Sequence, residues 1–211
     1  MSEGASSSVE VFVVEDEPTV REALKAILTL AGFSVTYFAD GASLAAEMHA
    51  KSPACIILDV HIPGKSGLDI LKELNAEGYP APIFIMSGQG DIPMAVEAIK
   101  NGAHDFIEKP FRGPEVITRV RQAIEARGRR AAQGDAGLRP VLNFPGREPL
   151  SRREREVLAQ IMAGASNKEA GRALGISPRT IEVHRAHIME KLGAKNAADL
   201  IRIVMSEGRP S

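Results

Sequence analysis

Short apolar runs alternate with amphipathic stretches over the first 127 residues of the chain. Runs rich in β-branched and aromatic residues occupy 9–14, 33–38, 55–58, 83–86 and 106–107, and they predict five strands. After each run, apolar residues recur at helical spacing, in 18–31, 42–50, 68–76, 94–100 and 115–127. Five strand–helix units favour an α/β fold, a five-stranded doubly wound parallel sheet with helices on both faces.

The pattern changes after residue 127. The segment 128–149 contains four glycines and three prolines and has no apolar period, which is typical of a linker, with a short ordered piece expected around 141–144. The remaining residues have helical spacing throughout. We therefore predict a first domain at 7–127, a linker at 128–147 and a small all-α domain of four helices at 148–208.

Helix-capping signals set the bounds of these four helices. Two Ser-x-x-Glu boxes and a Ser-Pro pair are typical of helix starts, and glycines follow two helix ends. The tight turn between the second and third helices describes a helix-turn-helix. The capping residues are Ser151 with Glu154, Ser166 with Glu169, Ser177 with Pro178, Asn196, Gly175 and Gly193.

Composition adds a charge asymmetry that the net charge of -1 hides. Residues 1–124 carry 10 Lys/Arg and 17 Asp/Glu, whereas residues 125–211 carry 16 and 10, so the halves differ in sign. The basic half could bind a polyanion such as DNA, although a solvated surface would look the same. Without a membrane-length apolar run or a secretory signal, we expect a cytoplasmic protein that makes no membrane contact. The single cysteine, Cys55, excludes an internal disulfide.

Polar residues follow four of the predicted strands. Glu15 and Asp16 follow the first strand, Asp59 the third, Ser87 the fourth and Lys109 the fifth. Parallel sheets gather such residues at the carboxyl ends of their strands. Close carboxylates favour a hard cation such as Mg²⁺. A carboxylate can also attack a phosphoryl group, whose charge Mg²⁺ and a lysine would neutralise. This set of residues is what the phosphorylation of an aspartate requires.

Four segments, VFVVEDEP, IILDVHIPGKSGLDIL, IFIMSGQGD and GAHDFIEKPF, resemble the signature motifs of response-regulator receiver domains. The resemblance implies that Asp59 is the phosphoacceptor and that Lys109, after a cis peptide to Pro110, pairs with the phosphoryl group. It implies a Mg²⁺ site and a pair of switch residues. The metal ligands would be Glu15, in place of the commoner aspartate, with Asp16, Asp59 and the His61 carbonyl; the switch residues would be Ser87 and Phe106.

A phosphoryl group on Asp59 adds a compact dianion, and we expect it to bias a two-state receiver. The resemblance implies that the face formed by the fourth helix and fifth strand then changes and dimerises, or releases the DNA-binding domain. The last helix of the chain could add a second dimer contact through Leu200, Ile201, Val204 and Met205, or those four could be ordinary core. The expected dimer face comprises Ile92, Met94, Ala95, Lys100 and Ile107.

The third helix of the second domain is the candidate recognition helix. Ile181, Ile188 and Leu192 share its apolar face and should point to the core. Arg can pair with guanine, Glu can accept from cytosine and Val can touch a thymine methyl, whereas phosphate contacts position without specifying. We expect Thr180, Glu182, Val183, Arg185 and Ala186 to face the bases, and Asn167, Lys168, Arg179, His184 and Lys191 to contact phosphates.

The segment SNKEAGRALGISPRTIEVHRAHIMEKL resembles the LuxR-type helix-turn-helix of the NarL/FixJ family, and the receiver string GDIPMAVEAIKNGAHDFIEKPF is most similar to the FixJ branch. The resemblance implies a two-component transcription regulator and not an enzyme. A sensor histidine kinase, promoter DNA and a second copy of the chain would be its partners, with RNA polymerase a further candidate. Two alternatives are DNA binding that ignores phosphate and a Mg²⁺-dependent phosphatase with an aspartyl-phosphate intermediate.

Overall fold

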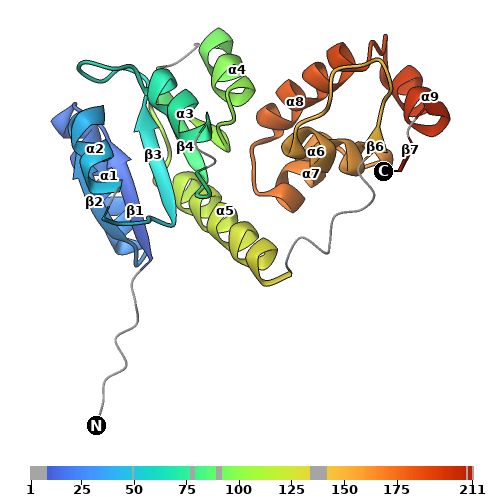
Figure 1. The fold of residues 1–211 in the computed structure, drawn as a ribbon. Coiled ribbons are helices and arrows are strands. Elements are labelled where there is room, and N and C mark those ends of the chain that lie inside the picture. Colours follow the sequence, from blue (N-terminus) through green and yellow to red (C-terminus); the bar gives the residue numbers. More distant parts are fainter. Residues whose placement is uncertain are drawn as a thin grey trace. The chain divides into compact units, whose positions relative to one another are not determined.

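A computed structural model describes residues 9–48, 50–76, 79–88, 92–133, 142–207 and 209–210. The chain divides into two compact units, Met1–Arg127 and Gly128–Ser211, which Figure 1 colours blue to yellow-green and yellow to red. In the described part of the chain, no helix has both the length and the apolar character needed to cross a membrane.

The first unit alternates strands and helices, as the hydrophobic pattern predicts. All its strands are parallel and lie in the order β2-β1-β3-β4-β5, which confirms the predicted doubly wound sheet. The strands are β1 (Glu10–Val14), β2 (Ser34–Phe38), β3 (Cys55–Asp59), β4 (Ile83–Ser87) and β5 (Asp105–Glu108), and the helices are α1 (Pro18–Leu30), α2 (Gly41–Met48), α3 (Gly67–Ala76), α4 (Ile92–Lys100) and α5 (Gly113–Gln133).

Successive residues of each strand face opposite sides of the sheet, so the strands contribute to two cores. On one side Val11 and Val13 of β1 pack with Leu24 and Leu28 of α1 and with the buried residues of α5. The other side is covered by α2, α3 and α4 (Figure 1), where Leu44 and Leu71 are buried. Burial on both faces explains why the central strands read as continuous apolar runs.

The order of the strands reverses at β1, whose neighbours are β2 and β3. In open α/β sheets, ligand sites lie outside the carboxyl ends of the strands at such a reversal. The ends of β1 and β3 carry the acidic residues that the sequence singled out, and Val14 pairs with Leu58 one step before them. The topology therefore brings the predicted site residues to one edge of the sheet.

The second unit contains the four predicted helices, α6 (Arg152–Met162), α7 (Asn167–Leu174), α8 (Pro178–Lys191) and α9 (Ala197–Glu207). Their predicted caps are confirmed: Ser151 and Ser166 each form a complete capping box, and the Ser177 side chain accepts from the Thr180 N–H. Gly175 ends α7 in the left-handed region, φ 69°, which a glycine adopts without steric cost. The Asn196 side chain accepts from the Asp199 N–H at 2.9 Å.

Ordered structure enters the segment predicted as a linker from both ends. Helix α5 continues beyond Arg127 to Gln133, so that Gly128 lies inside the helix and does not end it. Strand β6 (Leu142–Asn143) pairs antiparallel with β7 (Arg209–Pro210), which the sequence pattern did not predict. Phe144 and Leu150 are buried in the core of the helical unit. Of the piece expected around 141–144, residue 141 lies outside the described residues.

A buried carboxylate ties the start of α6 to the end of α8. Glu154 accepts from the Ser151 N–H at 2.7 Å and lies 3.1 Å from Lys191 Nζ. Burial alone would raise the pKa of Glu154, but the Ser151 N–H and Lys191 outweigh it and hold that pKa below 4.5. A carboxylate with a lowered folded-state pKa stabilises the fold above its ordinary pKa, and this stabilisation is lost as the pH falls through the folded-state value.

We therefore expect Glu154→Gln to cost about 2 kcal/mol of unfolding free energy near neutral pH, the size of a hydrogen bond to a charged group. The difference from wild type should shrink as the pH falls below 4.5. Urea unfolding of the full chain, followed by helical circular dichroism across this pH range, measures both. Glu169→Gln removes the equivalent but exposed carboxylate of α7 and should cost less. A pH-independent difference for Glu154→Gln would contradict the ionic origin.

Candidate functional site

Three carboxylates meet at the carboxyl ends of β1 and β3. Glu15, Asp16 and Asp59 each place one oxygen within 4.8 Å of the others. Glu15 is 0% exposed and Asp59 is 4% exposed, whereas Asp16 faces solvent. The Glu17 N–H donates to Glu15 Oε1 at 3.0 Å and orients it. A cluster of hard oxygen donors with one exposed member suits a cation that keeps part of its water shell.

Lys109 places its ammonium between two of these carboxylates. Its Nζ lies 2.7 Å from Glu15 Oε2 and 2.7 Å from Asp59 Oδ2. Burial raises the pKa of Glu15, and the nearby Lys109 and Glu17 N–H offset only part of that increase. Burial lowers the pKa of Lys109, but the hydrogen bonds to Asp59 and Glu15 outweigh it, so the net direction is upward. Lys109 therefore keeps its proton and compensates the buried negative charge.

The next two strands bring a hydroxyl and an aromatic ring to the same edge. Ser87, the last residue of β4, is buried, and its carbonyl accepts from the Lys109 N–H at 2.8 Å. Phe106 lies on β5 beside Ile85 of β4 and is also buried. The peptide bond from Lys109 to the following proline is cis, as the resemblance implied. The last residues of β3 and β4 and the residue after β5 thus place Asp59, Ser87 and Lys109 at one edge of the sheet.

His61 sits in the loop after β3. Its side chain is exposed, and its N–H lies 3.4 Å from Asp59 Oδ1. In the same loop the Val60 N–H donates to the Met86 carbonyl, and the Gly67 N–H donates to the Val60 carbonyl. These backbone contacts hold the loop against the sheet end that carries Asp59.

Gly67, at the start of α3, packs directly against the backbone of Asp59. A Cβ at this position would overlap the Asp59 carbonyl oxygen and lie 2.9 Å from its carbonyl carbon. We expect Gly67→Ala to destabilise the first unit by about 1–3 kcal/mol, as overpacking does, and to slow chemistry at Asp59 several-fold. Urea unfolding and the rate of phosphodonor labelling measure the two effects. Gly128→Ala meets open space inside α5, so it should leave labelling unchanged and, because alanine favours a helix more than glycine does, should stabilise the chain by about 0.5–1 kcal/mol. Equal destabilisation by both substitutions would contradict the steric explanation.

The expected dimer face on α4 and β5 is only partly exposed. Ala95 and Ile107 are buried, because Ala95 faces the sheet and Ile107 packs with α5 and α1 in the core. The expectation that Ala95 and Ile107 belong to the dimer face is therefore wrong, because neither side chain is accessible. Met94 is half-buried and Lys100 is exposed, so these two can belong to a surface. The side chain of Ile92 lies outside the described residues.

Helix α8 has one buried side and one solvent side. Ile181 and Ile188 are fully buried, as expected, and Glu182 and Ala186 are exposed. Val183, Arg185 and Arg179 are half-buried on the remaining solvent side. These five residues, expected to contact DNA, therefore have side chains that can reach a ligand outside the domain.

Two residues expected at the DNA-facing side lie on the buried side instead. Thr180 is 0% exposed, and its hydroxyl lies 2.8 Å from the Ser177 hydroxyl. His184 is 4% exposed and follows Ile181 by one helical turn. The expectation used only apolar residues to define the inner face, and the inner face also takes these two polar ones. The expectation that Thr180 faces the bases and that His184 contacts a phosphate is therefore wrong, because both side chains lie in the interior of the domain.

Lys191 and Lys168, both expected at phosphates, differ in their surroundings. The Lys191 ammonium lies 3.0 Å from Glu148 and 3.1 Å from Glu154, so it is already engaged inside the domain. Lys168 is exposed at the start of α7.

The four apolar residues of α9 that were candidates for a second dimer contact differ in exposure. Leu200 and Val204 are buried in the core, whereas Ile201 and Met205 are exposed, Met205 by 78%.

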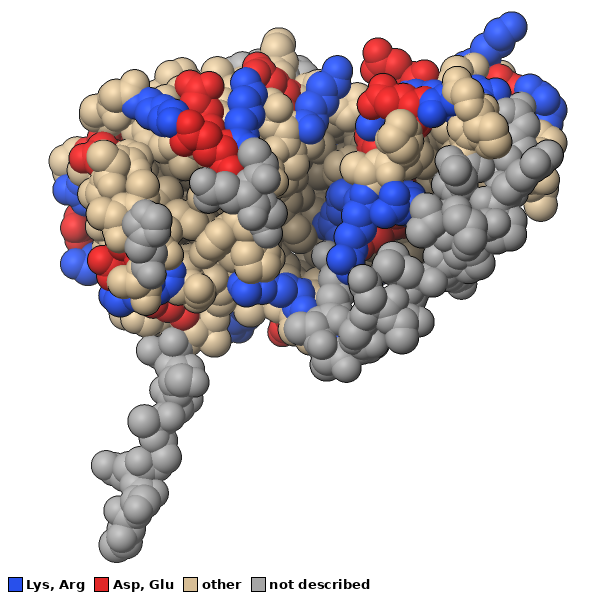
Figure 2. Space-filling view, viewed as in Figure 1, with Lys and Arg blue, Asp and Glu red and all other residues tan. Residues whose placement is uncertain are grey.

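The face drawn in Figure 2 shows no large patch of a single charge on either unit. Blue and red side chains stand next to each other there over both units.

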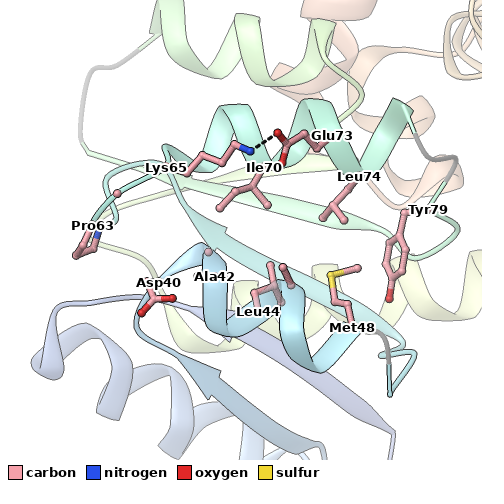
Figure 3. A pocket seen from close by; sticks show the side chains of 13 residues that line it. Asp40, Ala42, Leu44, Met48, Pro63, Lys65, Ile70, Glu73, Leu74 and Tyr79 are labelled. Atoms are coloured by element: carbon pink, nitrogen blue, oxygen red, sulfur yellow. Dashed lines mark hydrogen bonds and ion pairs between the residues drawn. The ribbon is translucent and has the colours of Figure 1, made fainter.

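The structure also has a cavity of about 740 Å³ between α2 and α3, with Leu44, Met48, Ile70 and Leu74 along its walls (Figure 3). Its rim carries Lys65, and none of the charged residues at the ends of β1, β3 and β5 lines it.

Two family models match the chain, one for each unit. Residues 11–121 match the response regulator receiver domain, and residues 148–204 match the bacterial regulatory proteins of the luxR family. The first match includes every residue of the acidic site, and the second includes the whole of α6, α7 and α8.

Two relatives and one solved structure each match more than nine tenths of this chain. The transcriptional regulatory protein FixJ of Bradyrhizobium diazoefficiens is 39% identical over 94% of this chain and 95% of its own. The response regulator protein TodT of Pseudomonas putida is 36% identical over 92% and 84%. The crystal structure of full-length FixJ from B. japonicum covers 95% of this chain and 97% of its own, with 36% identity and a TM-score of 0.55.

Proposed function

This chain belongs to the response regulators that join a receiver domain to a LuxR-type DNA-binding domain, and we propose that it accepts a phosphoryl group on Asp59 and regulates transcription in response. The donor would be a sensor histidine kinase and the target promoter DNA. One observation carries the proposal: the buried Asp59 carboxylate lies 2.7 Å from Lys109 Nζ beside two further acids. The second unit supplies the output.

Phosphoryl transfer would begin at the Asp59 carboxylate. One carboxylate oxygen attacks the phosphorus of a phosphohistidine, a P–O bond forms, the P–N bond breaks and the imidazole leaves with a proton from water. Lys109, whose ammonium already contacts Asp59, balances the charge on the transferred group. Ser87 can donate its hydroxyl to a phosphoryl oxygen. These residues bind and orient the group.

The carboxylates of Glu15, Asp16 and Asp59, with the His61 carbonyl, are the ligands that we assign to Mg²⁺. When bound, Mg²⁺ would neutralise the repulsion among the carboxylates and the incoming phosphoryl oxygens. The fit rests on three carboxylate oxygens within 4.8 Å of one another and on the exposed side of Asp16, which leaves room for water ligands.

Phosphorylation would act through Ser87 and Phe106. The added dianion attracts the Ser87 hydroxyl, and the Phe106 ring turns inward to fill the space that Ser87 leaves. We propose that the surface around Met94 and Lys100 then supports a homodimer, which would place two copies of α8 on half-sites about one helical turn apart. In this scheme the chain is the receiver of a single phosphoryl group and does not turn over a metabolite; RNA polymerase is the further partner that transcription activation would require.

Mass spectrometry after incubation with acetyl phosphate and Mg²⁺ tests the proposal. We expect one phosphoryl group per chain, mapped to Asp59, and a lower apparent Kd for DNA selected from a random library. Labelling at another residue, or steady release of phosphate from added phosphorylated metabolites, would contradict the proposal and favour the phosphatase alternative. Labelling of Asp59 without any change in DNA affinity would favour DNA binding that ignores phosphate.

A further inference from the structure

Asn167 bridges two charged residues of the recognition helix α8. Its side-chain nitrogen donates to Glu182 Oε1 at 3.2 Å, and its side-chain oxygen accepts from Arg185 Nη1 at 3.3 Å. The chemistry of the partners fixes the orientation of the amide, because a carboxylate only accepts and a guanidinium only donates. No local pattern in the sequence predicts this contact, since Asn167 lies 15 residues from Glu182.

Both partners of Asn167 stand on the solvent side of α8. Glu182 is exposed and Arg185 is half-buried, whereas Ile181 and Ile188 on the opposite side are fully buried. A glutamate can accept from the amino group of cytosine, and an arginine can donate to guanine. Glu182 and Arg185 can therefore each discriminate base pairs.

Glu182 and Arg185 are three residues apart on one helix, a spacing at which opposite charges readily pair. Among the described contacts each bonds Asn167 instead of the other. A direct pair would occupy the groups that base recognition requires. The amide of Asn167 holds them apart and gives each a defined direction while leaving further hydrogen-bonding capacity on both.

Asn167 is itself held firmly. It is the first residue of α7, directly after the capping box in which Ser166 and Glu169 satisfy each other's donors and acceptors. The turn from α7 to α8 is tightly packed, because a Cβ at Gly171 would lie 2.7 Å from the Ile176 carbonyl oxygen. The distance from Asn167 to α8 is therefore set by the backbone and not by a mobile side chain alone.

We propose that Asn167 is a specificity-determining positioning residue, which orients Glu182 and Arg185 for base recognition instead of contacting phosphate as the sequence suggested. The proposal rests on the proposed DNA-binding function. It assigns to Asn167 an effect on which bases are preferred, with little effect on the affinity for DNA in general. A phosphate contact would have the opposite signature, a uniform loss of affinity and a weaker dependence on salt.

Selection from a random DNA library with the full-length, phosphodonor-treated protein tests this assignment, followed by Kd measurements on the selected site and its single-base variants at several salt concentrations. For Asn167→Ala we expect discrimination at one or two base pairs per half-site to fall about 5- to 10-fold, with an unchanged salt slope. Asn167→Asp should retain the preference that depends on Arg185 and lose the one that depends on Glu182, because two carboxylates repel.

Lys168→Ala is the matched control, since Lys168 is the exposed neighbour on the same helix turn. It should weaken binding to all sequences alike and reduce the salt slope by about 1. If Asn167→Ala behaves like Lys168→Ala, or leaves discrimination as in wild type while circular dichroism shows a native fold, the proposal is overturned. If the wild-type protein selects no sequence, the proposed DNA-binding function fails, and this assignment with it.

Discussion

Replacing Asp59 by asparagine should abolish phosphodonor labelling and, with it, the whole phosphate-dependent gain in DNA affinity. Asparagine keeps the shape of the side chain but removes the nucleophilic carboxylate. Lys109 retains its 2.7 Å ion pair with Glu15, so the variant should fold. Labelling is read by intact-protein mass, and DNA affinity is read by titration of a selected site with and without acetyl phosphate and Mg²⁺.

Asp40→Asn is a suitable control for this prediction. Asp40 also follows a strand, β2, but it is only half-buried and caps the start of α2 by accepting from the Ser43 N–H at 2.8 Å. Asparagine caps helices about as well as aspartate, so the control should label and bind DNA like wild type. An Asp59→Asn protein that still gains DNA affinity with the donor would show that another residue or partner triggers the output. Equal loss in both variants would point to a general effect of removing an acid.

The positions of the acidic site followed from two local rules. Apolar runs of strand length end in polar residues at 15, 59, 87 and 109, and parallel strands with helical crossovers place these ends at one edge. The five strands of this sheet all run in the same direction, so their carboxyl ends, and with them Asp59 and Lys109, lie at the same edge. The prediction of the pocket was therefore as good as the prediction of the strands.

Surfaces were harder to predict than the pocket. The sequence gives helical periodicity but not which polar residues the core accepts, and so Thr180 and His184 were placed outside when they are inside. The assignment of Ala95 and Ile107 to a dimer face is wrong for a similar reason, since resemblance to a dimerising face does not show which of its residues are accessible. Contacts between distant segments, such as the Asn167 bridge to α8, leave no mark in a local pattern.

The largest effect on stability should come from another such distant contact, between α5 and the edge strand β5. Arg119 Nε donates to Asp105 Oδ2 at 3.0 Å, and its Nη2 donates to the carbonyl oxygen of Phe106. Asp105 also accepts from the Phe106 N–H at 2.9 Å. Because β5 is the edge strand of the sheet in the described part of the chain, these side chains take the place of a neighbouring strand for the backbone of Phe106.

Arg119→Ala would remove the guanidinium that pairs with the Asp105 carboxylate, which is 0% exposed, and the donor to the Phe106 carbonyl. Breaking a buried ion pair from one side costs about 3–5 kcal/mol, which corresponds to a fall in Tm of roughly 10–15 °C for a unit of this size. Urea and thermal unfolding of the full chain measure the loss. Arg119→Lys should recover only part of it, because an ammonium cannot reproduce the planar fork that serves Asp105 and Phe106 together.

The matched control lies two residues further along α5. Arg121 is exposed and donates to the Ala31 carbonyl at 2.7 Å, so Arg121→Ala should cost at most about 1 kcal/mol. If Arg119→Ala costs no more than Arg121→Ala, the edge of β5 is satisfied by water and the pair with Asp105 is not a main support of the fold. If the predicted difference is found, the backbone of Phe106 is held to α5 by side chains, and its fixed position in the unphosphorylated chain has a structural cause outside the acidic pocket.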